Sequence, residues 1–180
     1  RSLDVVVERL RVWYESYRID DAPPVSAKLV QVVCVGGVNV EGDLELGSGA
    51  RQARALVAAV KDIDPTDFAS LSDKLAPLLP GAVAGARADY DRFEAEAAEI
   101  DACGTATPKP ACAVEMRYLY TAIRTISPGQ TFAQLALGFA LAEADPRFVG
   151  VNIAAPEHDP IAVRNYNLHM RMIAFLKTRH

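Results

Sequence analysis

The chain has 180 residues, of which 51% are hydrophobic, and its formal net charge at pH 7 is −4. This length suits a single domain with its own core. The acidic balance and the lack of a basic stripe argue against nucleic-acid binding, and no apolar run approaches the roughly 18 residues of a membrane span. The sequence opens on Arg1 without a signal peptide, so we expect a cytoplasmic protein.

The first part of the chain predicts a helix, a buried strand and a glycine-rich segment. Apolar side chains fall on one helical face over Ser2–Ile19, and Ala27–Val35 has the composition of a buried strand. The glycine-rich segment contains neither GxGxxG nor the Lys-Ser/Thr of a phosphate loop. Because Gly36-Gly37 follows a strand, a backbone-lined anion site is one interpretation. We favour a turn that leads to a short strand at Asp43–Leu46.

The middle of the chain predicts three helices. The first is the alanine-rich segment Ala50–Ile63, and the second starts at Asp64-Pro65 and ends near Pro77–Pro80. The third covers Gly81–Ile100 and carries five acidic residues. We expect these to form a solvated face rather than a metal cluster.

The three cysteines cannot all pair within one chain. Cys34 lies in the predicted first strand, where it is expected to pack. Cys103 and Cys112 flank the loop CGTATPKPAC and are near enough in sequence to form a bridge. Two reduced thiols are the interpretation that we favour for a cytoplasmic protein. A zinc site at this pair would lack two further ligands at a usual spacing.

The last third of the chain predicts a strand–helix–strand–helix unit. The first strand is Val114–Tyr120, and the next helix has Ser127 as its cap, Pro128 in its first position and Gln130 completing a capping box. Phe132, Leu135, Phe139 and Ala142 give this helix one apolar face. Asp145-Pro146 ends it, Phe148–Ala154 is the second strand, and Asp159-Pro160 starts the last helix.

Two buried strands joined by a helix are expected to be parallel, so the fold class is α/β, with parallel strands alternating with helices. In such sheets the ligand binds beyond the carboxyl ends of the strands. Those ends are Thr121–Arg124 and Asn152–His158. The sequence therefore predicts that any site is built there.

Three segments in this unit resemble the middle of bacterial adenosine deaminase-like proteins of the amidohydrolase superfamily: RYLYTAIR, FVGVNIAAPEHD and NYNLHMRMIAFL. The resemblance implies a zinc-dependent (β/α)8 barrel that converts adenosine and water to inosine and ammonia. Such a barrel typically needs about 250 residues, so the chain corresponds to part of one. We expect a single α/β domain over residues 1–180, in which 43–180 form the deaminase-like segment and 1–42 have no clear family match.

The metal-ligand motifs of the family are not found in this sequence. Adenosine deaminases carry a His-x-His, a His-Ala-Gly-Glu and a pair of aspartates, and the three histidines here, His158, His169 and His180, form none of these. We therefore assign no catalytic and no metal-binding residue. Zinc belongs to the parent family, and we expect none to bind this chain alone, which is expected to be inactive.

The resemblance instead implies that this segment forms part of the purine pocket. Asn152 and Ala155 align with an aspartate and a glycine of the better-known deaminases, in which the glycine N–H meets a purine ring nitrogen. Glu157 is either a ligand contact or a carboxylate that caps the next helix, and His158 is either a general base or an exposed loop residue. The candidate substrate-binding residues are Ile123, Arg124, Asn152, Ala155, Glu157 and His158.

The expected partners are a purine nucleoside and protein, with no nucleic acid and no membrane. A partial barrel leaves parallel strand edges unpaired, so we expect the chain to self-associate or to pair with the missing half of the barrel. The alternative function is that of a non-catalytic, truncated or decayed α/β domain that binds a purine or a protein partner.

Overall fold

A computed structural model describes residues 30–36 and 48–180 of the chain. The predicted helix Ser2–Ile19 and the predicted short strand Asp43–Leu46 lie outside the described residues. In the described part, no helix is both long and apolar enough to cross a membrane.

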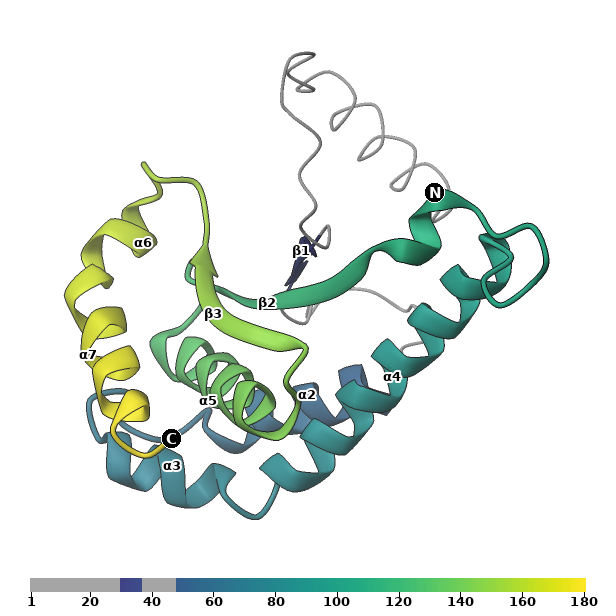
Figure 1. Cartoon of the computed structure of the whole chain (residues 1–180). Coiled ribbons are helices and arrows are strands. Elements are labelled where there is room, and N and C mark those ends of the chain that lie inside the picture. The colour runs from purple at the N-terminus through teal and green to yellow at the C-terminus, as the bar shows by residue number, and fades with distance from the viewer. Residues whose placement is uncertain (1–29, 37–47) are drawn as a thin grey trace.

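The described elements alternate between strands and helices, with three strands in one sheet (Figure 1). The sheet has the order β1-β2-β3, and both strand pairs are parallel, which confirms an α/β chain with parallel strands. In chain order the elements are β1 (Val30–Gly36), α2 (Ser48–Ala59), α3 (Phe68–Leu75), α4 (Leu79–Ile100), the 3-10 helix η1 (Pro110–Ala113), β2 (Glu115–Ile123), α5 (Pro128–Ala144), β3 (Phe148–Ala154), α6 (Pro160–Arg164) and α7 (Tyr166–Lys177).

The predicted boundaries are confirmed for β3, for both ends of α5, for the end of α4 and for the start of α6, and several others shift. The strand predicted to end at Tyr120 continues to Ile123, because its last residues pair with β3. The last predicted helix is divided into α6 and α7 at Asn165, whose φ of −96° and ψ of 6° depart from helical values.

The second predicted helix begins later than expected, at Phe68. The Asp64 carboxylate accepts hydrogen bonds from the backbone N–H and the hydroxyl of Thr66, both at 2.8 Å, and so forms a turn rather than a helix cap. Asp67 caps α3 instead, because its side chain accepts from the backbone N–H of Ser70 at 3.1 Å.

Helix α5 is the centre of the described structure and contacts β2, β3, α2, α3, α4 and α7. In Figure 1 it lies directly against β2 and β3, and α2, α3 and α7 are on the same side of the sheet. The predicted apolar face packs into the core, and the burial of every residue from Thr131 to Gly138 shows that α5 is covered beyond that one face. The capping box of Ser127 and Gln130 is confirmed and fixes where this buried helix begins.

The turn from α5 to β3 is held by a network of charged side chains around Arg147. Its guanidinium lies 2.6 Å from Asp145, 2.9 Å from Glu94 and 2.7 Å from Asp91. Tyr118 in β2 donates a hydrogen bond to Glu94, so the network ties α4, β2 and β3 together. Asp145 is buried, and hydrogen bonds from Arg147 lower its pKa to about 2 against the opposing effect of burial.

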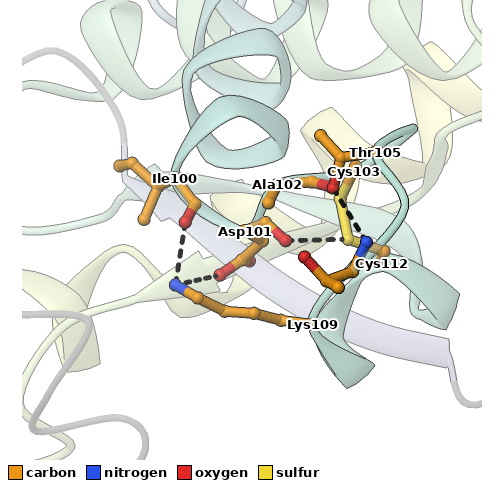
Figure 2. The surroundings of a disulfide bond; sticks show 8 residues. Ile100, Asp101, Ala102, Cys103, Thr105, Lys109 and Cys112 are labelled. Carbon is orange, nitrogen blue, oxygen red and sulfur yellow. Dashed lines mark hydrogen bonds and ion pairs between the residues drawn. A yellow bond between two sulfur atoms is a disulfide. The ribbon is translucent and has the colours of Figure 1, made fainter.

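A disulfide joins Cys103 and Cys112, so the reduced thiols that we favoured from the sequence are wrong (Figure 2). The loop folds back because Ala102 has a φ of 55°, in the left-handed region, directly after the end of α4. Lys109 then donates from Nζ to the carbonyl of Ile100 at 2.8 Å and pairs with Asp101 at 3.3 Å. These contacts place Cys112 beside Cys103.

Candidate functional site

The carboxyl ends of β2 and β3 lie at one edge of the sheet. Ile123, the last residue of β2, pairs with Ala154, the last residue of β3. The backbone N–H of Arg124 donates to the carbonyl of Ala154 at 3.2 Å, which carries the pairing one residue past the strand. The two segments predicted to carry the site therefore meet.

Arg124 and Glu157 form an ion pair at this edge, with Nη2 and Oε1 2.9 Å apart. The two partners differ strongly in burial: Arg124 is 7% exposed, whereas the Glu157 side chain is 92% exposed. The Nε atom of Arg124 is buried and has no hydrogen-bond partner among the described residues. The Arg124 guanidinium is thus buried with its Nε–H group lacking an acceptor in the described structure.

Glu157 does not cap the following helix, which was one of its two interpretations. Asp159 is the cap of α6, because its Oδ1 accepts from the backbone N–H groups of Ile161 at 2.8 Å and Ala162 at 3.2 Å. The Glu157 carboxylate is therefore available to Arg124.

Side chains of α5 fix the end of β2. Gln134 accepts from the backbone N–H of Ile123 through Oε1 at 3.1 Å, and Thr131 donates from its hydroxyl to the Ile123 carbonyl at 3.2 Å. With its Oε1 used in this way, Gln134 has Nε2 left as a buried donor without a partner in the described structure. Ile123 itself is half-buried.

His169 in α7 is fully buried, and neither ring nitrogen has a hydrogen-bond partner in the part of the chain described here. Burial lowers the pKa of His169, and the nearby positive charge of Arg124 lowers it further. Arg164 and Asn167, which are near His169 in sequence, are exposed instead. His169 lies three residues before Met172, on the buried face of α7. This helical spacing is the sequence signal that would have predicted a buried His169.

The other predicted residues line the same edge without joining the ion pair. Asn152 is exposed in β3 and lies opposite Thr121 of β2. Ala155 is half-buried just after β3, and His158 is exposed in the turn before α6. Among the described residues, no hydrogen bond or ion pair links these three side chains to Arg124.

Within residues 30–36 and 48–180, no group of three or more His, Cys, Asp or Glu side chains is arranged to hold a metal ion. The residues of this part therefore do not fit the zinc that the resemblance implies. We derive no chemical step through a metal.

Comparison of the chain with protein-family models, with curated proteins and with solved structures finds no significant match. The resemblance to adenosine deaminases therefore depends on the sequence segments alone.

Proposed function

We propose that the chain is a segment of an adenosine deaminase-like hydrolase and supplies part of the wall of its purine site. The observation that carries the proposal is the meeting of Arg124 and Glu157, two of the expected pocket residues, at the carboxyl edge of a parallel sheet. Ligands of parallel α/β proteins bind at this edge.

The arrangement of strands and helices supports a part of a (β/α)8 barrel as the finer fold class. Tyr120 and Val151 face α5, as the short distances from Gly138 to both side chains indicate. Because side chains alternate along a strand, Thr121 and Asn152 face the other way. In such a barrel the helices cover the outer face, and residues placed like these two point inward.

In this proposal the segment binds and orients the purine, and the chemistry comes from residues outside the described part. Purine ring nitrogens accept hydrogen bonds, and the exposed amide of Asn152 is a suitable donor. The backbone N–H of Ala155 is the second donor that we expect to meet the ring. Zinc, if the parent protein holds it, would supply an activated water.

We expect the purified chain to bind adenosine saturably in isothermal titration calorimetry. Asn152→Leu is expected to weaken the affinity about tenfold, the equivalent of one hydrogen bond. Asn167→Leu is the matched control, because Asn167 is an exposed asparagine on α7, and it should leave the affinity unchanged. The proposal fails if wild-type chain shows no saturable binding or if both variants behave alike.

The same preparation, supplied with zinc and adenosine, is expected to show no loss of ultraviolet absorbance from conversion to inosine. Turnover that a chelator abolishes would show that this chain holds metal ligands that we have not assigned. It would contradict our placement of the chemistry outside the described residues.

We also propose that the chain associates with a second copy or with the missing part of the barrel. Strand β3 pairs with β2 on one side, and no described strand pairs with its other edge. An unpaired parallel edge offers a row of backbone donors and acceptors to another chain. Size-exclusion chromatography with light scattering is expected to give a mass above 19.4 kDa, and a stable monomer at high concentration would contradict this.

A non-catalytic α/β domain is the second candidate function, in which the chain binds a purine or a protein without turning it over. The observation that favours it is the lack of a metal-binding group in the described part of the chain. The cytoplasmic location of the chain stays a prediction. The Cys103–Cys112 disulfide argues against it, because disulfides are more typical of proteins in oxidising compartments.

A further inference from the structure

Three buried polar side chains lie after β2, in α5 and in α7, and α5 contacts both β2 and α7. Arg124 follows β2, Gln134 lies in α5 and His169 lies in α7, and each is less than a tenth exposed. Each has at least one buried nitrogen without a hydrogen-bond partner among the described residues. A buried polar group without a partner destabilises the folded state, so three such groups on neighbouring parts of the fold call for an explanation.

The nitrogen atoms without partners are all hydrogen-bond donors, or become donors on protonation. Arg124 Nε and Gln134 Nε2 carry hydrogens and accept nothing, and His169 carries at least one N–H. Gln134 is held in this orientation, since its Oε1 already accepts from the Ile123 N–H. What these groups lack is an acceptor.

The Arg124–Glu157 contact shows which acceptor the guanidinium can take. Nε and Nη2 form the edge of a guanidinium that binds an oxyanion with two parallel hydrogen bonds. Glu157 reaches Nη2 with one oxygen at 2.9 Å, while Nε stays without a partner. The Glu157 side chain is 92% exposed, so it can leave toward solvent at little cost.

We propose that Arg124, together with Gln134 and His169, binds a small oxyanion that replaces the Glu157 carboxylate on the guanidinium. The ligand accepts from both Nε and Nη2 of Arg124, where Glu157 accepts from one. Phosphate and a carboxylate share this chemistry. The oxyanion site shares Arg124 and Glu157 with the proposed purine site. Its other two donors, Gln134 in α5 and His169 in α7, are not among the candidate purine-binding residues.

The positive charge of Arg124 disfavours protonation of the buried His169. An oxyanion beside Arg124 offsets that charge and offers an acceptor to the imidazole. Ligand binding is therefore expected to shift the ring signals of His169 in an NMR spectrum. An anion that binds to exposed lysines or arginines would leave the signals of a fully buried ring in place.

The experiment is an NMR titration of the full chain with sodium phosphate and, in a separate arm, sodium acetate, at matched ionic strength against sodium chloride. Saturable shifts of His169 with phosphate or with acetate are the expected result, and the arm with the tighter binding identifies the kind of oxyanion. Shifts with neither ligand, or equal shifts with chloride, would overturn the proposal.

Two variants sharpen the test. Glu157→Gln removes the competing carboxylate charge from an exposed position and is expected to tighten binding several-fold without affecting folding. Arg124→Lys keeps the charge but loses the paired donors, and should weaken binding about tenfold or more. Arg164→Lys, at an exposed arginine of α6, is the control and should bind as wild type.

If Arg124→Lys does not fold, Glu157→Gln still decides the matter, because unchanged or weaker binding in that variant would overturn the proposal. The outcome of this titration does not decide the purine proposal, which is tested by a different variant and a different ligand. Asn152→Leu should weaken adenosine binding and leave the oxyanion titration unchanged.

Discussion

Replacing Asp145 with alanine is expected to lower the free energy of unfolding by about 2–4 kcal/mol. The Asp145 side chain is 3% exposed and accepts from Arg147 at its backbone N–H and at its guanidinium, with distances from 2.6 to 3.2 Å. It also pairs with Arg87 at 3.3 Å. Alanine would leave the backbone N–H of Arg147 and the two guanidinium groups without their buried acceptor at the turn before β3.

The matched control is Asp91→Ala, which removes a different carboxylate from the same guanidinium. Asp91 lies 2.7 Å from Arg147, but its side chain is 63% exposed. Exposed ion pairs contribute about 0–1 kcal/mol, so this variant should lose little stability. Urea unfolding followed by circular dichroism measures both. If both variants lost the same free energy of unfolding, the burial of Asp145 would not be the cause of its larger effect.

The stabilising effect of Asp145 should also depend on pH. Its folded-state pKa is lowered to about 2 from an ordinary value of 3.8, so its contribution is fully present above pH 4. That contribution, on the order of 2 kcal/mol, is lost as the pH falls from about 4 toward 2. The difference in unfolding free energy between wild type and Asp145→Asn should therefore be largest near neutral pH and shrink in acid.

Local chemistry made the ends of several elements predictable from the sequence. Ser127 and Gln130 determine the start of α5 through hydrogen bonds within one turn, and Asp159 does the same for α6. The general rule for parallel strands also placed the Arg124 and Glu157 segments at the same edge of the sheet. None of these inferences requires knowledge of how distant parts of the chain pack.

The burial of the site residues could not be predicted in the same way. His169 is buried on the face of α7 that packs near α5, and Arg124 is buried although a charged residue after a strand is ordinarily exposed. The Cys103–Cys112 bridge depends on the left-handed conformation of Ala102, which is an uncommon choice for alanine. Such features depend on contacts that are not local in sequence.

Replacing Gly138 with alanine is the second change for which we expect a large effect, a loss of about 1–3 kcal/mol in unfolding free energy. A Cβ atom at this position would lie 2.6 Å from Cδ1 of Tyr120 and 3.2 Å from Cγ1 of Val151. The Tyr120 ring is buried among its neighbours, so α5 would have to move away from both strands. Gly138 thus sets the closest approach of α5 to the sheet.

Gly129→Ala in the same helix is the matched control. Its Cβ would meet Val60 at 3.4 and 3.8 Å, which are ordinary contact distances, and alanine favours the helix by up to about 1 kcal/mol over glycine. We therefore expect this variant to be as stable as wild type or more so in urea unfolding. If Gly138→Ala were equally well tolerated, the packing of α5 against Tyr120 would be looser than the structure shows. The positions of Gln134 and Thr131 at the end of β2, which depend on the same helix, would then be in question as well.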